Sequence, residues 1–282
     1  MNIHLTLVAA NDDLKKSHFE KLNVSDSHIK WLIPNKVAFI KIENTLPLAE
    51  MKKFRVSLNK DKIDIFCVEQ KPRHLFMADM DSTIVTSETL DELADEVGIK
   101  DQVATITERA MRGELDFHAA IKERVALLKD LPLSALEKTL QNTQISTGAD
   151  TLLAELKKHN LYCVLVSGGF TQFTAPIASQ LGFDKNHGNQ FEIKNNALTG
   201  KVIEPILDKD SKLKFLHHYC TQLKLDLSDS IAIGDGANDL PMLENAGLGI
   251  GYQPKPLVAE KILNCIIHTD LTSVLYMQGL TA

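Results

Sequence analysis

The residues LFMADMDST at positions 75–83 decide the fold of this 282-residue chain, because they join an apolar run to a pair of acids. Residues 75–78 are apolar throughout, which is typical of a strand in a parallel sheet that is covered on both faces. Asp79 and Asp81 follow that run directly. Ligands of open α/β sheets bind at the carboxyl ends of the strands, so we expect a functional site here. A pair of acids alone is more often a solvated turn.

A second acidic motif, GDGAND at residues 234–239, follows the apolar run that ends at Ile233. It adds Asp235 and Asp239 to the carboxyl edge of the same predicted sheet. Carboxylate oxygens suit Mg²⁺, which binds one or two protein carboxylates together with phosphate and water. Acids gathered at one point repel each other unless a cation compensates them. The two motifs together therefore favour a Mg²⁺ site over an ordinary turn.

Two weaker signals point to an anion. The stretch VSGGF at residues 166–170 ends another apolar run, and we expect it to open a helix. A hydroxyl and free backbone N–H groups at a helix N-terminus bind phosphate, although a plain strand-to-helix turn has the same sequence. Lys212 lies at the start of a helix predicted over residues 211–223, where a lone lysine is by itself only a solvated charge.

The order of the remaining elements predicts an α/β protein with a Rossmann-like parallel sheet. Strands and helices alternate from residue 161 onward, which indicates a parallel sheet flanked by helices. Leu, Ala, Glu and Lys at helical spacing predict four helices after the first strand, at residues 89–97, 102–111, 117–129 and 133–141. Gly98, Gly113 and Asp116 suit their ends. We interpret this block, at about residues 87–146, as a helical cap inserted over the carboxyl edge of the sheet.

Residues 1–71 predict a small α+β domain ahead of a second domain at residues 72–282. The order is strand, helix, strand, strand, helix, strand, which is ferredoxin-like. The expected strands are residues 3–8, 28–33, 37–42 and 63–68, and the expected helices are residues 12–22 and 48–58. This order resembles an ACT-type regulatory domain, but the Gly-rich turn that often binds an amino acid is missing.

The composition excludes several classes of function. The net charge is −6 and no run is strongly basic, which argues against nucleic-acid and anionic-membrane binding. The start of the chain has no secretory pattern, and no apolar run approaches the ~20 residues that span a bilayer. The four cysteines form no CxxC pair, as expected of reduced thiols in a cytoplasmic protein. Association into a homodimer stays open.

Taken together, residues 74–282 resemble the haloacid-dehalogenase superfamily. The strings MDST at 80–83 and IGDGAND at 233–239 are the most specific part of this resemblance. Within the superfamily the chain is most similar to the phosphoserine phosphatases. Further stretches support that similarity: Glu88, MRG at 111–113, DF at 116–117, KERV at 122–125, Lys255-Pro256, DLT at 270–272 and Leu275-Tyr276.

The resemblance implies Mg²⁺-dependent hydrolysis of O-phospho-L-serine through an aspartyl-phosphate, the last step of serine biosynthesis. It makes Asp79 the nucleophile and Asp81 the general acid and then base, with its main-chain carbonyl on the metal. Asp235 becomes a metal ligand, and Asp239 orients the site or ligates through water. Lys212 neutralises charge between Asp79 and the phosphate.

The same resemblance implies the contacts with the substrate. Ser167, Gly168 and Asn238 would bind the phosphoryl oxygens. Glu88 and Arg124 would grip the ammonium and the carboxylate, although both are also typical helix-surface charges. Met111 and Phe117 would wall the pocket, although both are also typical of a cap core.

Two alternatives remain. The first is a related phosphatase or phosphotransferase that acts on another small phosphate ester, since only the cap distinguishes substrates. The second is a non-catalytic protein that senses amino acids. The presence of Asp79, Asp81, Lys212 and Asp235 argues against the second, because a decayed site loses some of these residues.

Overall fold

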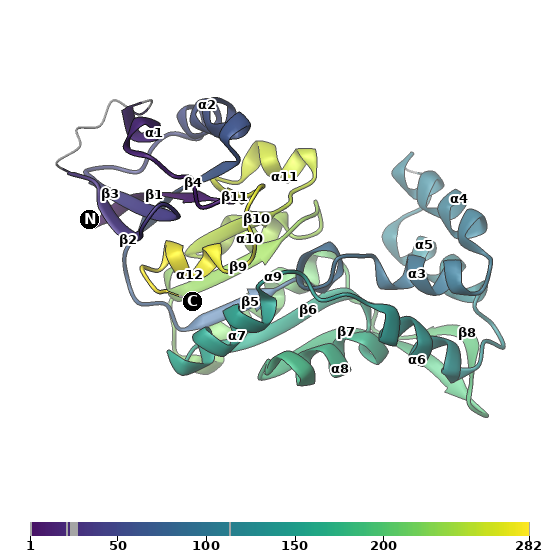
Figure 1. The fold of residues 1–282 in the computed structure, drawn as a ribbon. Helices are drawn as coiled ribbons and strands as arrows, with labels where there is room; N and C mark the ends of the chain where they lie inside the picture. The colour runs from purple at the N-terminus through teal and green to yellow at the C-terminus, as the bar shows by residue number, and fades with distance from the viewer. Residues whose placement is uncertain (1, 21, 23–27, 113, 282) are drawn as a thin grey trace.

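The computed structural model of the chain describes residues 2–20, 22, 28–112 and 114–281, without the side chains of Met111 and Lys209. These residues form two sheets, of four and seven strands, with helices packed around them (Figure 1). In Figure 1 the four-stranded sheet is purple and lies beside the yellow C-terminal elements. Among the described residues no helix combines the length and apolar character needed to cross a membrane.

The N-terminal sheet confirms the ferredoxin-like order. Its strand order is β2-β3-β1-β4, and every neighbouring pair is antiparallel. Its elements are β1 (Ile3–Ala9), α1 (Lys16–Glu20), β2 (Lys30–Ile33), β3 (Val37–Ile42), α2 (Leu48–Leu58) and β4 (Ile63–Glu69). The helix expected over residues 12–22 is shorter, since Asp12 has a φ of 53° that no α-helix accommodates. Lys21, within that range, lies outside the described residues.

The seven-stranded sheet confirms the parallel core. Its order is β11-β10-β9-β5-β6-β7-β8, and all neighbours are parallel except the edge strand β8. The strands are β5 (Leu75–Ala78), β6 (Tyr162–Phe170), β7 (Lys185–Lys194), β8 (Ala197–Ile203), β9 (Ser230–Gly234), β10 (Leu248–Tyr252) and β11 (Asn264–Ile266).

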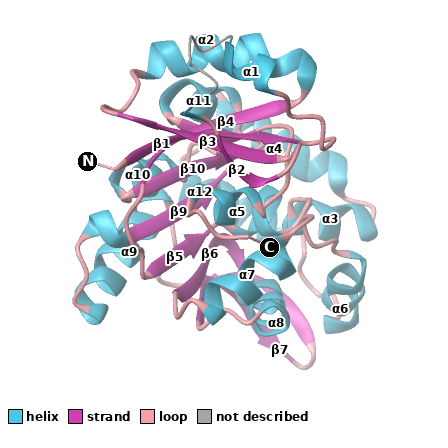
Figure 2. Cartoon of the chain, turned by 60° about the vertical axis from the view of Figure 1, so that its left-hand side comes forward, coloured by secondary structure: helices cyan, strands magenta, loops and turns pink. Residues whose placement is uncertain are grey.

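Helices cover both faces of this sheet, which explains why its central strands are apolar throughout (Figure 2). Phe76 and Ala78 pack into one buried cluster, while Leu75 and Met77 pack into another on the opposite face. The first face carries α7 (Ala149–Lys158), α8 (Thr171–Leu181) and α12 (Ser273–Met277). The second carries α9 (Lys209–Leu223), α10 (Leu240–Asn245) and α11 (Pro256–Lys261).

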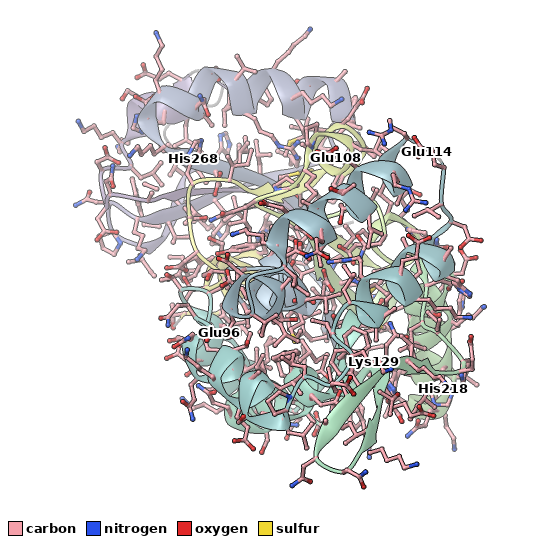
Figure 3. The ribbon with its side chains drawn as sticks, turned by 90° about the vertical axis from the view of Figure 1, so that its right-hand side faces the viewer. Glu96, Glu108, Glu114, Lys129, His218 and His268 are labelled. Carbon is pink, nitrogen blue, oxygen red and sulfur yellow. The ribbon has the colours of Figure 1, made fainter. Side chains whose placement is uncertain are left out.

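Five described α-helices lie between β5 and β6 in the sequence, and we call the first four of them the cap helices. They are α3 (Thr89–Glu96), α4 (Lys100–Met111), α5 (Phe117–Ala126) and α6 (Leu133–Asn142). Gly98 follows α3 with a φ of 74°, and the Asp116 side chain caps α5 by accepting from Ala119 N, both as predicted. Gly113 lies outside the described residues. Glu108 on α4 and Glu114, between α4 and α5, are exposed and are labelled in Figure 3.

The hairpin β7–β8 supports the cap helices, and the sequence analysis assigned no strands there. Its turn is Asn195-Asn196, and both residues have positive φ values, of 52° and 58°. Such a two-residue turn joins antiparallel strands with the correct twist. Two backbone hydrogen bonds tie β8 to the segment between α5 and α6, from Asp130 N to Leu198 O and from Leu198 N to Leu131 O, both 2.9 Å long.

Candidate active site

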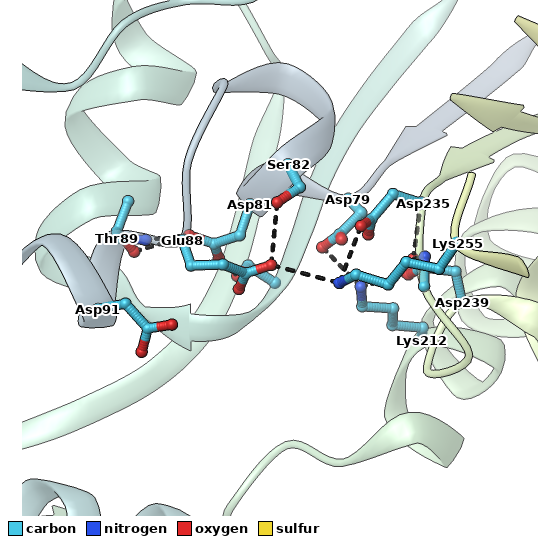
Figure 4. Close-up of polar contacts among 12 residues, drawn as sticks. Asp79, Asp81, Ser82, Glu88, Thr89, Asp91, Lys212, Asp235, Asp239 and Lys255 are labelled. Atoms are coloured by element: carbon cyan, nitrogen blue, oxygen red, sulfur yellow. Dashed lines mark hydrogen bonds and ion pairs between the residues drawn. The ribbon is translucent and has the colours of Figure 1, made fainter. Parts of the chain in front are cut away.

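Three neighbouring strands bring the predicted site together at one edge of the core sheet. Strand β5 lies between β6 and β9 and runs parallel to both. Asp79 follows β5, Ser167 lies near the end of β6, and Asp235 follows β9. Because the three carboxyl ends coincide, residues far apart in the sequence meet in one place (Figure 4).

A buried acidic cluster lies at this edge. Asp79, Asp235 and Asp239 each offer a carboxylate oxygen within 4.8 Å of the others. Burial, followed by the charge of Asp239, raises the pKa of Asp79 well above its ordinary value, although Lys212 opposes the shift. Burial also raises the pKa of Asp235. Oxygen donors so close together fit a hard cation, since a cation removes their mutual repulsion. The cluster could therefore bind a metal ion.

Lys212 supplies a positive charge beneath this cluster. Its buried Nζ lies 2.6 Å from Oδ1 of Asp79 and also pairs with Oδ1 of Asp239. Burial alone would lower the pKa of Lys212, but the charges of Asp239 and Asp79 outweigh it and raise the pKa. The two carboxylates therefore favour the charged form of Lys212. It reaches the site because α9 begins directly before it, at the N-cap residue Asp208.

Asp239 is engaged on both oxygens by the protein itself. While Oδ1 pairs with Lys212, Oδ2 accepts from Asp235 N at 3.1 Å and from Gly236 N at 3.0 Å. A Cβ on Gly234 would lie 2.4 Å from the Asp239 carboxyl carbon, so this close approach needs glycine at position 234. Asp239 therefore shapes the loop that presents Asp235.

Both carboxylate oxygens of Asp81 accept hydrogen bonds from neighbouring residues. Its Oδ1 accepts from both N and Oγ1 of Thr89 at 2.8 Å, and its Oδ2 accepts from Oγ of Ser167 at 2.7 Å. Burial, then the charge of Glu88, raises the pKa of Asp81. A carboxyl with a raised pKa retains its proton to a higher pH, which suits a proton donor.

The stretch SGGF corrects one expectation. Helix α8 begins only at Thr171, so Ser167 and Gly168 lie in the last residues of β6 and not at the helix N-terminus. Gly169 N donates to Oγ of Ser167 at 2.7 Å, and a Cβ on Gly169 would lie 3.0 Å from Oδ2 of Asp81. Asn189 on β7, which the sequence analysis missed, donates to the Gly168 carbonyl at 2.8 Å. Strand pairing with β7 is irregular between Val166 and Phe170, and the Asn189 side chain contacts the backbone within that interval.

A cavity of about 240 Å³ opens above these groups, between the core sheet and the cap helices. Eight of the predicted site residues line it: Asp79, Asp81, Glu88, Phe117, Arg124, Gly168, Asp235 and Asn238. Ser167, Lys212 and Asp239 are buried below its wall. The Phe117 ring would lie 3.7 Å from a Cβ on Gly168, so it roofs the cavity at that point. The side chain of Met111 is outside the described part of the chain.

The cavity carries charges of both signs on its cap side. Oε1 of Glu88 accepts from Oγ of Ser82 at 3.0 Å and lies 3.5 Å from Nζ of Lys255 (Figure 4). Lys255 also lies 3.0 Å from Oδ2 of Asp235. Arg124 on α5 pairs with Oδ1 of Asp91 on α3 at 2.5 Å. Glu88 and Arg124 therefore bring charges of opposite sign to the lining of the cavity.

Lys255 is the clearest residue whose contacts the sequence analysis missed. The Lys255-Pro256 pair was noted only as part of a resemblance. Its position carried a usable signal, since a proline just inside a helix start after β10 puts Lys255 at the same sheet edge as the two acidic motifs.

Comparison with known proteins agrees with this geometry. The chain is 33% identical over 268 residues to SerB2, a phosphoserine phosphatase of Mycobacterium tuberculosis, across 92% of this chain and 66% of the relative. It is 44% identical over 201 residues to a phosphoserine phosphatase of Streptococcus thermophilus, across 71% of this chain and 94% of the relative. A crystal structure of a HAD family hydrolase from Salmonella enterica serovar Typhi aligns with a TM-score of 0.88 at 30% identity, over 98% of each chain.

The chain thus spans 66% of the length of the Mycobacterium relative but nearly all of the Streptococcus relative. The haloacid dehalogenase-like hydrolase family matches residues 76–244, which include both acidic motifs, the Ser-Gly-Gly stretch and Lys212. Because this match covers more than half of the sequence and the relatives agree with it, the chain belongs to the haloacid dehalogenase-like hydrolase family.

Proposed function

We propose that the chain is a Mg²⁺-dependent phosphatase that hydrolyses O-phospho-L-serine to L-serine and phosphate. One observation carries the proposal. The buried pair of Asp79 and Lys212 lies at the base of a cavity, and Glu88 and Arg124 line the same cavity on its cap side. The phosphate of phosphoserine suits Asp79 and Lys212, and its ammonium and carboxylate suit Glu88 and Arg124. The phosphoserine phosphatases of Mycobacterium and Streptococcus support this choice of substrate.

Asp79 is the proposed nucleophile. Its carboxylate attacks phosphorus, and the bond to the serine oxygen breaks as Asp81 donates a proton to that oxygen. Water then attacks the phosphate on Asp79, Asp81 accepts the proton of that water, and phosphate leaves. The raised pKa of Asp81 supports its role as the acid, because burial favours the protonated form that this role requires.

The metal site is proposed from the donors that are present. Oxygens of Asp79 and Asp235, with the main-chain carbonyl of Asp81, would hold Mg²⁺, and Asp239 would orient the loop or ligate through water. Bound Mg²⁺ would supply positive charge to the phosphoryl oxygens. Lys212 supplies a second positive charge from the protein, next to Asp79.

The remaining roles follow the same division between core and cap. Ser167, Gly168 and Asn238 would contact the phosphoryl oxygens. Glu88 would bind the substrate ammonium and Arg124 its carboxylate, with a planar guanidinium that matches a carboxylate on two N–H groups. Phe117 and Met111 would close the pocket around the short carbon skeleton of serine.

We further propose two domains, residues 1–71 and residues 72–282, with the cap at about residues 87–146. The separate N-terminal sheet and the four cap helices support this division. A cytoplasmic location is proposed from the cysteines, since all four are buried free thiols.

The test is phosphate release from a panel of phosphate esters with and without added Mg²⁺. The panel contains phosphoserine, phosphothreonine, phosphotyrosine, sugar phosphates and an aryl phosphate. We expect phosphoserine to give the highest kcat/KM and excess chelator to abolish the activity. A sugar phosphate as the best substrate would leave the family chemistry in place and favour the alternative of another small ester. Full activity in excess chelator would contradict the proposed requirement for Mg²⁺.

A further inference from the structure

The first turn of α3, residues 88–91, holds three separate parts of the site. Glu88 lines the cavity. Thr89 donates two hydrogen bonds of 2.8 Å to Oδ1 of Asp81. Asp91 accepts a hydrogen bond of 2.5 Å from Nη2 of Arg124. Since Asp91 N donates to the Glu88 carbonyl at 3.0 Å, these residues belong to one helical turn and keep a fixed spacing.

Arg124 reaches this turn from another helix, α5, and lines the catalytic cavity. Its side chain is 23% exposed, and Asp91 is the carboxylate that pairs with it among the residues described. The pair therefore links two cap helices beside the cavity. It also leaves part of the guanidinium uncommitted, because the hydrogen bond to Asp91 uses Nη2 and the enclosed Nε has no partner.

Asp91 contacts Arg124 from outside the catalytic cavity. Asp91 is absent from the lining of that cavity and instead lines a neighbouring one of about 230 Å³. Thr107 lines both cavities and so lies between them. A substrate in the catalytic cavity would therefore meet the guanidinium of Arg124 without meeting Asp91.

We propose that Asp91 is a positioning residue that sets substrate specificity by orienting the guanidinium of Arg124, an inference that rests on the proposed function. A guanidinium is planar, so anchoring one corner restricts the plane in which its other N–H groups can meet a carboxylate. Anchoring before binding also reduces the conformational entropy lost when the substrate arrives. This orientation of Arg124 favours the binding of phosphate esters that carry a carboxylate. An aryl phosphate has no carboxylate for Arg124 to bind.

The test compares Asp91→Asn and Asp91→Ala with a matched control, Asp95→Asn. Asp95 lies one turn further along α3, is exposed, and pairs with Lys100 at 3.0 Å, so its substitution removes the same charge from the same helix. For each variant, kcat and KM are measured with phosphoserine and with an aryl phosphate that has no carboxylate.

We expect Asp91→Ala to lower the preference for phosphoserine, as the ratio of the two kcat/KM values, by about tenfold. The loss should lie in the KM for phosphoserine and not in kcat. Asp91→Asn, which keeps an acceptor oxygen, should lose less, and Asp95→Asn should keep the wild-type ratio. Asp91→Asn also preserves the side-chain shape, so the test stands if Asp91→Ala fails to fold.

Two results would overturn the inference while the wild-type chain still hydrolyses phosphoserine. An unchanged ratio would mean that Asp91 serves only the fold. A lower KM for phosphoserine would mean that Asp91 competes with the substrate carboxylate for Arg124. Absence of phosphoserine hydrolysis by the wild-type chain is a distinct outcome, because it would overturn the proposed function itself.

Discussion

Asp81 illustrates how single residues are tuned at this site. Donors from Thr89 and Ser167 hold both of its oxygens, so its carboxyl has one orientation toward the cavity that it lines. Burial raises its pKa, and a raised pKa means that the acid form persists above the usual range for aspartate and is lost as the pH rises through the raised value. The departing serine oxygen is a poor leaving group and needs that proton.

We therefore predict that Asp81→Asn slows the first chemical step with phosphoserine by about 10²–10⁴-fold. An aryl phosphate has a good leaving group, so its single-turnover release of the phenol should be much less affected. In the wild-type chain, the rate of the first step with phosphoserine should fall toward alkaline pH. The rate of that step with the aryl phosphate should show no such fall. Rapid-quench measurements on both substrates check this, and equal losses would exclude Asp81 as the acid.

Among single residues, the sequence predicted the side chains that directly follow a strand. It predicted less well the side chains that pair between separate elements. Asp79 and Asp235 were predictable because each directly follows an apolar strand, and parallel strands end at one edge. The pairs Arg124–Asp91 and Lys255–Glu88 were not predictable. The first arises where two cap helices pack together and the second where the start of the cap meets the core, and no local pattern encodes either contact.

At the scale of elements, the start of α9 determines whether Lys212 reaches Asp79. Asp208 caps this helix: its Oδ1 accepts from the backbone N of Asp210 and of Ser211, both at 3.1 Å. Burial alone would raise the pKa of Asp208, but the hydrogen bonds from Ser211 and Asp210 outweigh it and the pKa is lowered. Because its pKa is lowered in the folded chain, the Asp208 N-cap stabilises the fold at every pH above the ordinary pKa of aspartate. This stabilisation is lost as the pH falls through the lowered pKa.

We predict that Asp208→Ala costs about 1 kcal/mol of unfolding free energy at neutral pH and also lowers kcat, because the helix start that carries Lys212 frays. Asp208→Asn is the matched control, since asparagine caps as well as aspartate and does not titrate. It should keep the neutral-pH stability. Urea unfolding at neutral and acidic pH checks both variants, and equal destabilisation by Ala and Asn would contradict the capping role.

The elements that the sequence analysis missed include helix α7, which carries buried Leu152, Leu153 and Leu156 at helical spacing, and the hairpin β7–β8. Both central strands and cap helices carry strong apolar patterns, and they were predicted to within a few residues. In this hairpin β7 is mostly polar and the apolar residues of β8 lie only at its two ends, so neither strand gave a clear alternating pattern. Its Asn195-Asn196 turn was the available signal, because asparagine tolerates positive φ in two-residue hairpins.

At the scale of the whole molecule, the N-terminal sheet is joined to the core sheet by buried polar contacts. Asp64 on β4 is 2% exposed, and its Oδ2 accepts from the backbone N of Ile267, His268 and Thr269 at 3.0–3.1 Å. Asn264 on β11 accepts from Cys67 N at 2.8 Å and donates to Cys67 O at 3.2 Å. In Figure 3, His268 marks where the C-terminal loop meets the N-terminal sheet.

We predict that Asp64→Asn destabilises the full chain by about 1.5–3 kcal/mol, because an amide must then face backbone donors in place of a charged acceptor. Asp13→Asn, at an exposed position of the N-terminal unit, is the control and should change stability by less than about 0.5 kcal/mol. Thermal and urea unfolding measure both. An unchanged free energy of unfolding in Asp64→Asn would mean that this junction contributes no stability.

A fragment of residues 71–282, which lacks the N-terminal sheet, tests what this junction contributes to stability and activity. Every residue that lines the catalytic cavity lies at position 79 or later, so we expect the fragment to retain phosphoserine hydrolysis. It should have a lower Tm than the full chain, because the partners of Asn264 and of the loop at 267–269 are lost. Inactivity of a folded fragment that binds Mg²⁺ would show that residues 1–70 complete the site.

The central claim is that Asp79 attacks phosphoserine and carries its phosphate. The most direct measurement is rapid acid quench of the chain during turnover of phosphoserine with Mg²⁺, followed by peptide mass spectrometry, with Asp79→Asn as the control. We predict phosphate on Asp79 in the wild-type chain, together with no phosphopeptide and no turnover in Asp79→Asn. Phosphate on Ser82 or Thr83, or turnover by Asp79→Asn, would contradict the account.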